Sequence, residues 1–511
     1  MSVSTSSPFE QEEARIAPWL ILLVIGTLLY RIGYVWAHDY SLFVDEAQYW
    51  LWSRDPAFGY YSKPPLVAWL VRVSTMLLGD GELGVKLPAL LAYPMAALGL
   101  YRLGAAMKSA RVGLIAAALF LSMPGQALGG WVLSPDALLL AAWSWALWLL
   151  WMARTQQQLK WWIGLGVVVG LGALAKYTML VFVPMAAWVL WQGRAAAPVR
   201  GKRPWLALAI VLVLIAPNIA WNIQNHFETV RHTADLTNAS QAGLHPRHFL
   251  EFLSAQWGIF GLLAFPLLVM LMVRSVRNGN AESRFLAPFT IPYLLAMILL
   301  SLATAANANW AVTAFAAGSV WLALWLDGRK PAWAWSVILL NFVLQLGILH
   351  YRDIGTKLGH PPSRSGKDLY ARVLGWRELG RALQPITEAQ GGLPILSGDR
   401  MLLAELNYYL QPRPYRVDAL DTDGVITNQY EMDTARRGLP QEALWVEFPN
   451  GMDADRGTHA DPDDAPDPPL LHQLYDVVED LGVIRVQRMD APARMVHVER
   501  VRRHITTEPL P

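Results

Sequence analysis

Residues 205–222 read WLALAIVLVLIAPNIAWN, an uncharged run long enough to cross a bilayer as a helix. Comparable apolar runs recur through the first 350 residues, at 16–36, 84–107, 112–131, 137–153, 161–175, 178–192, 249–273, 285–304, 310–326 and 332–350. The pattern predicts a mainly α, polytopic membrane protein of about 11 transmembrane helices.

Charge is distributed unevenly along the 511 residues. Charged residues make up 16% of the chain, and 44 of the 82 lie in the last 160 positions. We therefore predict a membrane domain over 1–350 and a small hydrophilic α/β domain over 351–511. Within the second domain, 369–383 and 401–410 have a helical pattern, and three short β-like runs lie at 393–397, 443–448 and 483–487. The acidic, proline-rich segment 452–469 predicts a mobile surface loop.

Composition and motifs also exclude several classes of function. A net charge of +2 provides no basic field, so nucleic acid is not an expected partner. The absence of cysteine excludes disulfides, thiol catalysis and cysteine metal sites. Neither G-x-x-x-x-G-K-[ST] nor H-E-x-x-H occurs, so ATP-driven transport and zincin chemistry are not expected, and no nucleotide cofactor is predicted.

The loops between the predicted spans alternate in basic content. Lysine and arginine concentrate in the connections near 108–111, 154–160, 194–203, 274–284 and 329–330. The positive-inside bias places these loops in the cytoplasm. The opposite loops, 37–83, 131–136, 222–248 and 304–309, then face outward together with the hydrophilic tail, and the two termini lie on opposite sides. Chemistry is expected on the outer face.

The outward loop 37–83 contains two apolar stretches that are too short or too interrupted to span the membrane. Both carry Trp, Tyr and Leu at helical spacing, which predicts two helices lying in the membrane interface. Lys63-Pro64-Pro65 supplies the start of the second helix, because proline fits the first turn.

Three outward acids are candidate catalytic residues. Asp45 and Glu46 are adjacent at the start of the first interfacial helix, and Asp136 lies where the third span is expected to emerge. Each could simply stabilise a helix N-terminus. Facing one another across a cleft, Asp45 and Asp136 could instead provide a general base or share a divalent metal ion.

Several outward cations and polar side chains complete the candidate site. Lys63 could bind a lipid phosphate or snorkel to the interface, and Lys176 has the same two alternatives. Asn309 could cap the helix that follows it or line a sugar pocket. The further candidates for donor-phosphate binding are Tyr60, Tyr61 and Arg231, and those for the substrate pocket are His226 and Trp310.

Several short motifs occur together in one order: V-D-E-A-Q-Y-W at 44–50, F-G-Y-Y-S-K-P-P-L at 58–66, L-S-P-D-A-L-L at 133–139, then A-K-Y-T, P-N-I-A-W-N and N-W-A-V-T-A. The ordered set resembles the GT-C membrane glycosyltransferases, specifically the bacterial branch of the dolichyl-phosphate-mannose protein mannosyltransferase superfamily, which includes the lipid A aminoarabinose transferase. The resemblance covers the whole membrane domain. It assigns the two first-loop acids to Asp45 and Glu46, the phosphate-binding lysine to Lys63 and the second acid to Asp136.

The resemblance implies transfer of a sugar from a polyprenyl-phosphate donor to a lipid, glycan or protein acceptor, lipopolysaccharide included, at the periplasmic face of the bacterial inner membrane. Aminoarabinose transferases usually carry arginine three residues after the first acid, whereas this chain has Gln48, so another cation is expected to hold the donor phosphate. Direct displacement would invert the anomeric carbon, with Asp45 as base or, for a phosphate acceptor, as an orienting group. The rival class, a transporter or flippase of lipid-linked sugars, typically has paired broken spans near the midplane, which this sequence lacks.

Overall fold

The computed structural model of the chain describes residues 8–156, 158–192, 201–235, 243–304, 306–360, 368–421, 424–449, 469–488 and 491–504. The chain forms two compact units. The membrane unit comprises Met1–Ala37, Lys63–Leu70 and Lys86–His350, and the mixed unit comprises His38–Ser62, Val71–Val85 and Tyr351–Pro511. The mixed unit thus combines two segments of the first long loop with the chain after residue 350.

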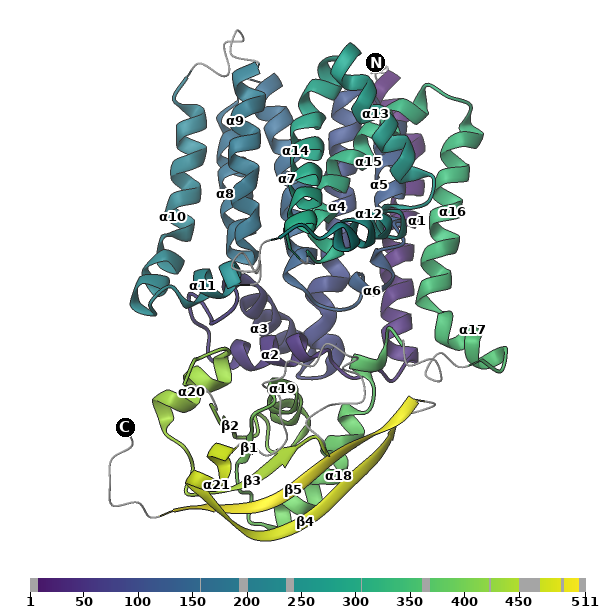
Figure 1. The fold of residues 1–511 in the computed structure, drawn as a ribbon. Coiled ribbons are helices and arrows are strands. Elements are labelled where there is room, and N and C mark those ends of the chain that lie inside the picture. The colour runs from purple at the N-terminus through teal and green to yellow at the C-terminus, as the bar shows by residue number, and fades with distance from the viewer. Residues whose placement is uncertain are drawn as a thin grey trace, which may run out of the picture. The chain divides into compact units, whose positions relative to one another are not determined.

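The membrane unit is built from helices (Figure 1). Its elements are α1 (Pro8–Ala37), α4 (Glu82–Met107), α5 (Ala110–Leu121), α6 (Gln126–Gly129), α7 (Pro135–Thr155), α8 (Leu159–Ala175), η1 (Tyr177–Val181), α9 (Phe182–Gln192), α10 (Arg203–Gln224), α11 (Glu228–Asp235), α12 (Pro246–Phe260), α13 (Ala264–Asn278), α14 (Ala281–Ala303), η4 (Ala308–Ala311), α15 (Val312–Asp327) and α16 (Pro331–Leu349). Helix α3 (Leu66–Leu78) runs from this unit into the mixed unit.

The lengths and apolar composition of these helices identify a multi-pass membrane protein. Among the described residues, seven helices are long and apolar enough to cross a membrane, or eight if the bent pair α12–α13 forms one span. Three of the four shorter apolar segments in the described residues, α5, α8 and η1–α9, coincide with further predicted spans. The count of about 11 spans and the predicted sidedness stay predictions.

Local sequence explains where many of these helices begin. Proline occupies the first turn of α7, α10, α12 and α16, where its fixed φ fits the helix and its missing N–H is not needed. The Asn280 side chain caps α14 by accepting a hydrogen bond from the Ser283 N–H at 2.8 Å. In the first loop, Pro65 stands before α3, and its carbonyl accepts from the Trp69 N–H at 3.1 Å. The predicted start of this helix at Lys63-Pro64-Pro65 is confirmed.

Two predicted spans are not continuous helices. The prediction over 112–131 is wrong after Leu121, because α5 ends there and Pro124 separates it from the short α6. The span predicted over 249–273 corresponds to a bent pair, since α12 and α13 meet at 108°, and a single crossing by this pair stays a prediction. At that bend Gly261 has a φ of +118°, and a Cβ there would lie 1.9 Å from Asn341 Oδ1. Only glycine fits this corner.

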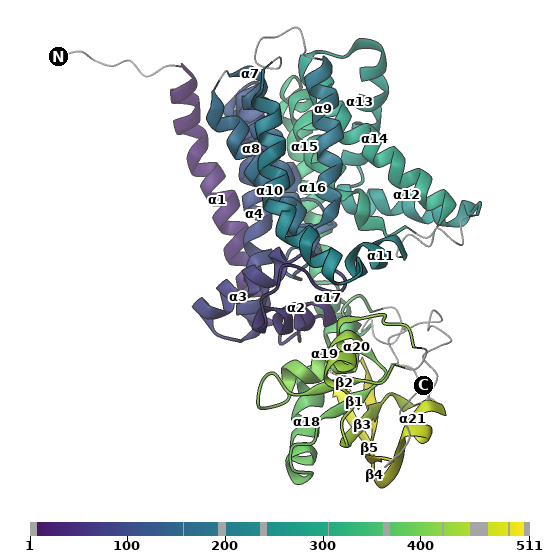
Figure 2. The same ribbon diagram turned by 90° about the vertical axis from the view of Figure 1, so that its left-hand side faces the viewer.

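Close helix contacts elsewhere in the membrane unit depend on small residues. Helices α8 and α10 lie side by side (Figures 1 and 2). At Gly166 of α8 an added Cβ would lie 2.6 Å from the Ala207 carbonyl oxygen of α10. The absence of a side chain therefore lets the two backbones approach, as small residues commonly do between membrane helices.

The mixed unit contains α2 (Val44–Arg54), α17 (Tyr351–Lys357), η6 (Ala371–Val373), α18 (Trp376–Ala389), α19 (Arg400–Tyr409), α20 (Gln429–Arg437) and α21 (Pro469–Leu474). It also contains a five-stranded sheet of order β2-β1-β3-β5-β4, formed by β1 (Ile395–Ser397), β2 (Val417–Ala419), β3 (Glu442–Glu447), β4 (Tyr475–Arg488) and β5 (Ala491–Arg503). The predicted α/β character of the hydrophilic tail is confirmed.

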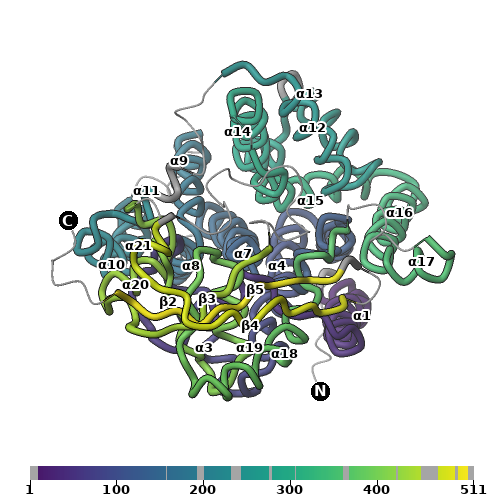
Figure 3. The backbone as a smooth tube through the Cα atoms, turned by 60° about the horizontal axis from the view of Figure 1, so that its bottom comes forward, coloured from purple at the N-terminus to yellow at the C-terminus, as the bar shows by residue number. Residues whose placement is uncertain are grey.

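The sheet is parallel on one side and antiparallel on the other. Strand β1 pairs in parallel with β2 and β3, whereas β5 runs antiparallel to both β3 and β4. The two long strands β4 and β5 follow one another along their length (Figure 3). Buried apolar side chains, among them Leu396, Trp445 and Val501, form a core on the sheet. The predicted loop 452–469 lies outside the described residues except for Pro469, which begins α21.

Candidate active site

Asp136 lies in the first turn of α7 and is the centre of a polar cluster in the membrane unit. Lys176 Nζ donates to Asp136 Oδ1 at 2.7 Å, and Asn309 Nδ2 donates to Asp136 Oδ2 at 3.2 Å. The Asp136 side chain is 15% exposed and the Lys176 side chain 23%. Both carboxylate oxygens therefore have a donor from another helix or turn, which is more than a local helix cap.

The elements around this cluster explain why these side chains meet. Lys176 terminates α8, and its backbone N–H donates to the Gly172 carbonyl. Asn309 belongs to the 3₁₀ turn η4, together with the half-buried Trp310. The Lys176 and Asn309 side chains each contact Asp136, and snorkelling by Lys176 and helix capping by Asn309 stay alternatives. The proposed roles in donor-phosphate and sugar binding stay predictions.

A second polar group follows Lys176 directly in sequence. The Tyr177 hydroxyl donates to Asn218 Oδ1 at 2.7 Å and accepts from Asn222 Nδ2 at 3.0 Å. Both asparagines lie on α10, and both are buried. Polar side chains are expensive inside a membrane helix unless they are paired, so this group fixes the position of η1 relative to α10.

Asp45 occupies the first turn of α2 in the mixed unit. Arg400, the first residue of α19, donates through both Nη1 and Nη2 to Asp45 Oδ1 at 3.1 Å. The same guanidinium donates through Nη1 to Gln48 Oε1. Among the residues that the structure describes, Asp45 Oδ2 has no hydrogen-bond partner. Burial lowers the pKa of Arg400, but the charge and hydrogen bond of the Asp45 carboxylate, with smaller contributions from Tyr430 and Tyr49, outweigh this effect and raise that pKa above its usual value.

Glu46 is fully buried beside Asp45, and Glu46 Oε2 accepts from the Phe43 N–H at 2.8 Å. This contact is the N-terminal cap that the sequence left open as an alternative. The predicted catalytic role of Glu46 is untested, although its described contact serves the start of α2.

The two tyrosines predicted to bind the donor phosphate are held within the mixed unit. The Tyr60 ring stacks on Trp52 at 4.6 Å between centroids, and its hydroxyl donates to the Trp52 carbonyl at 2.9 Å. Burial raises the pKa of Tyr60 to about 12, so the hydroxyl stays protonated. The Tyr61 hydroxyl donates to the Ile426 carbonyl at 2.9 Å. Phosphate binding by either tyrosine stays a prediction.

The remaining predicted residues belong to the membrane unit. Lys63 is half-buried, two residues before Pro65. His226 is exposed, with a φ of 53°, at the turn between α10 and α11. Arg231 on α11 lies 3.8 Å from Glu228 Oε1 through its Nη1. Lys63 and Asp136 thus lie in one unit and Asp45 in the other, and their convergence on one cavity stays a prediction.

Known proteins resemble this chain in sequence and fold. The family described as dolichyl-phosphate-mannose-protein mannosyltransferase matches residues 62–221. Over 422 residues, covering 81% of this chain and 87% of the relative, the chain is 33% identical to the lipid A galacturonosyltransferase RgtD of Rhizobium johnstonii. The chain belongs to the GT-C superfamily of membrane glycosyltransferases. The resemblance recognised in its motifs is confirmed.

Solved structures agree with this membership at the level of fold. ArnT of Cupriavidus metallidurans, in the apo state, matches with a TM-score of 0.58 and 17% identity over 94% of this chain and 98% of that chain. The archaeal oligosaccharyltransferase AglB of Archaeoglobus fulgidus matches with a TM-score of 0.52 and 11% identity over 86% of this chain and 70% of that chain.

Some polar residues of this glycosyltransferase were not predicted to belong to a site. Arg400 is the most important of them, and its only signal in sequence is an arginine directly after Asp399, the N-cap of α19. The Asp399 side chain accepts from the Met401 and Leu402 N–H groups. Asn218 and Asn222 could have been recognised as polar positions inside an apolar span.

A group of possible metal ligands lies on the sheet of the mixed unit. Asp480, His497 and Glu499 offer ligand atoms that lie within 4.8 Å of one another on β4 and β5. The pKa of His497 is raised by its hydrogen bond to Asp480 and by the nearby carboxylates, which together outweigh the effect of burial. A divalent ion shared by Asp45 and Asp136 stays a prediction.

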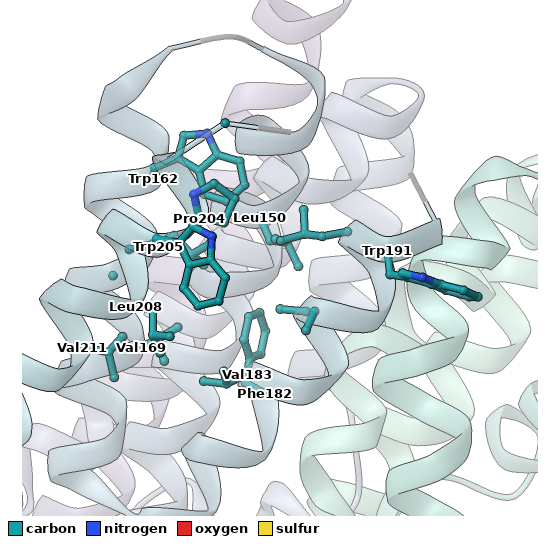
Figure 4. Close-up of a pocket in the computed structure, with 17 residues that line it drawn as sticks. Leu150, Trp162, Val169, Phe182, Val183, Trp191, Pro204, Trp205, Leu208 and Val211 are labelled. Carbon is teal, nitrogen blue, oxygen red and sulfur yellow. The ribbon is translucent and has the colours of Figure 1, made fainter. Parts of the chain in front are cut away.

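A cavity of about 360 Å³ opens between α8, α9 and α10. Figure 4 shows its apolar lining, which includes Trp162, Phe182 and Trp205. The lining residues that the structure describes include no titratable side chain. Such a surface suits hydrocarbon chains.

Proposed function

We propose that this glycosyltransferase moves a hexosyl or pentosyl group from a polyprenyl-phosphate donor to lipid A, or to another envelope lipid, glycan or protein, at the periplasmic face of the inner membrane. The name of RgtD supports lipid A as the first acceptor to test. The structure of ArnT with undecaprenyl phosphate and that of AglB with dolichol-phosphate support a polyprenyl-phosphate donor.

The proposal rests on the hydrogen bonding of the two Asp45 carboxylate oxygens. One of its carboxylate oxygens accepts two hydrogen bonds from Arg400, and the other has no partner among the described residues. A carboxylate fixed through one oxygen can accept a proton or a hydrogen bond through the other. Asp45 is therefore the best-placed general base of the predicted acids.

The proposed reaction forms one bond and breaks one. An acceptor hydroxyl oxygen attacks the anomeric carbon, the bond from that carbon to the phosphate oxygen breaks, and the configuration inverts. Asp45 Oδ2 takes the hydroxyl proton, which contributes about 10²–10⁴ in rate. The polyprenyl phosphate leaves with an additional negative charge, and we assign its stabilisation to Lys63. A phosphate acceptor has no proton to lose, in which case Asp45 orients the acceptor.

The membrane supplies the geometry for this chemistry. A polyprenyl chain stays in the bilayer and keeps its phosphate at headgroup level, where the predicted interfacial helices and Lys63 would meet it. An ammonium near the departing phosphate is worth more in the transition state, because charge on that phosphate increases as the bond breaks.

The test compares envelope glycans with and without the gene. Mass spectrometry of lipid A and other envelope glycans should show a sugar that is lost on deletion and restored by the wild-type gene. The purified protein should transfer the same sugar from a synthetic polyprenyl-phosphate donor to the isolated acceptor. Identical glycans in both strains, together with no transfer by the purified protein, would overturn the proposal.

A further inference from the structure

Arg400 occupies an unusual place for an arginine. It is the first residue of α19, where the positive end of the helix dipole disfavours a cation. Ordering its long side chain also costs conformational entropy. Both effects oppose the observed arrangement, so its contacts with α2 must provide the compensation.

Those contacts are made with one face of α2. Asp45 and Gln48 are three residues apart on this helix, which places their side chains on the same face. The Arg400 guanidinium reaches both, because Nη1 contacts Asp45 Oδ1 and Gln48 Oε1 while Nη2 contacts only Asp45 Oδ1. A single guanidinium thus fixes the acid and its neighbour together. The Arg400 and Asp45 side chains are each nearly two-fifths exposed, so solvent can reach the pair.

We infer that Arg400 is a positioning residue for sugar transfer: it occupies Oδ1 of Asp45, holds the carboxylate in one orientation and leaves Oδ2 for the acceptor. The inference rests on the proposed function. It also assigns a role to the chain after residue 350, because α19 belongs to the same unit as α2 although 355 positions separate Arg400 from Asp45. The C-terminal segment completes the reaction site with a residue that the first loop lacks.

An ordinary surface ion pair would behave differently. Exposed pairs usually contribute little to stability and nothing to chemistry. Arg502 provides a matched control, since its Nε donates to Glu442 Oε1 at 2.8 Å on the same sheet-containing unit. Removing Arg502 should leave kcat/KM within about two-fold, because Glu442 has no role in the proposed reaction.

The decisive experiment is a double-mutant cycle on the purified full-length protein, using a synthetic polyprenyl-phosphate sugar and isolated lipid A. Asp45→Asn should lower kcat/KM by about 10²–10⁴, and Arg400→Ala by about 10–10². If Arg400 acts through Asp45, the double variant should be no slower than Asp45→Asn alone. Multiplied effects would overturn the inference.

Two further measurements separate positioning from donor binding and from folding. A positioning residue changes kcat and leaves the KM for the donor within about two-fold, whereas a higher KM with unchanged kcat would overturn the inference. Arg400→Lys keeps the charge without the planar fork and should recover part of the rate. Because it retains a cation beside Asp45, it also serves as the test variant if Arg400→Ala does not fold.

The final experiment restores a cation beside Asp45 from α2 instead of α19. Gln48 lies one turn from Asp45 and contacts the same guanidinium, so Gln48→Arg should place a cation beside Asp45 in the Arg400→Ala background. We expect at least a three-fold recovery of kcat, and no recovery would overturn the inference. An inactive wild-type protein with this donor and acceptor would instead overturn the proposed function, and the inference with it.

Discussion

Asp136 in the membrane unit and Asp45 in the mixed unit both lie in the first turn of a helix, but their surroundings differ. Asp136 is 15% exposed, with one oxygen on Lys176 and the other on Asn309. Asp45 is 39% exposed, and its described contacts use a single oxygen. Two acids at the same position in a helix therefore differ in how much of the carboxylate is available to a substrate.

The difference indicates that the two acids have different roles, one structural and one chemical. An acid with both oxygens in use, one of them on a lysine, holds helices and turns in place. An acid with one oxygen fixed and one available can exchange a proton without losing its orientation. Helix-start position alone cannot distinguish these cases, because the macrodipole favours an acid at either site.

The largest expected effect tests this difference at Asp45. Asp45→Asn keeps an oxygen for the Arg400 contact but cannot take a proton, so kcat/KM should fall by about 10²–10⁴ with an unchanged Tm. The fall in kcat/KM is measured from initial rates of transfer with a synthetic polyprenyl-phosphate sugar as donor. The matched control is Glu442→Gln, which alters a surface acid paired with Arg500 and Arg502. Near-normal turnover in Asp45→Asn would remove Asp45 from the chemistry.

The next prediction concerns Lys63, the residue to which we assign binding of the donor phosphate. If it binds the departing phosphate, Lys63→Ala should lower kcat/KM by roughly 10³, and Lys63→Arg should recover only part of it. A lysine that merely snorkels to the interface predicts almost no loss in either variant, because arginine reaches equally far. Rates with purified protein decide between the two outcomes.

Replacing Asp136 should affect the stability of the protein more than the rate of transfer. Asp136→Asn leaves the Lys176 ammonium without its carboxylate, and we expect the Tm in detergent to fall by roughly 2–6 °C and kcat/KM by about 3–30-fold. Asp136→Asn combined with Lys176→Gln removes both charges and should restore most of the Tm. A loss of rate equal to that of Asp45→Asn, with no change in Tm, would show that Asp136 takes part directly.

How far the sequence predicts these sites depends on the range of the interactions. Apolar periodicity is local, so the helical segments were recognisable, whereas the corner at Gly261 depends on Asn341, which is distant in sequence. Asp136 and Lys176 were conspicuous as charges at the ends of apolar runs, but their pairing joins residues 40 positions apart. Strand β5 was missed, and β4 was predicted too short, because charged outer faces and register shifts obscure the alternation.

Arg400 shows the limit most clearly. Two of the three segments of the membrane unit, Lys63–Leu70 and Lys86–His350, lie between it and Asp45 in sequence, and no local pattern indicates a contact across 355 positions. Gln48 stands where aminoarabinose transferases usually carry arginine, and this difference indicated that a cation is missing from α2. Only the folded chain identifies a guanidinium that contacts Gln48 and Asp45 together.

The smallest expected effect concerns metal ions. A divalent ion shared by Asp45 and Asp136 would need carboxylate oxygens at about 2.0–2.6 Å. Three of the four oxygens already accept hydrogen bonds, two of them from cationic side chains, Lys176 and Arg400. A further positive charge there would be repelled, so we expect treatment with EDTA to change the rate of transfer by less than about two-fold.

A larger effect of EDTA would have three possible origins among the described residues, and the chain allows them to be separated. If activity fell at least ten-fold and returned with Mn²⁺ or Mg²⁺, the ion could be bound by Asp45 and Asp136, by Asp480, His497 and Glu499 on β4 and β5, or by a group of ligands that includes His38 and Asp353. His497→Ala removes the only nitrogen ligand of the second group and leaves both acids of the first intact. Sensitivity to EDTA that persists both in His497→Ala and in His38→Ala would mean that the ion displaces Arg400 or Lys176, and the contrast between an available Asp45 and an occupied Asp136 would then fail. Sensitivity that disappears in His497→Ala would assign the ion to the sheet and leave that contrast standing, because neither acid would have exchanged its cationic partner for a metal.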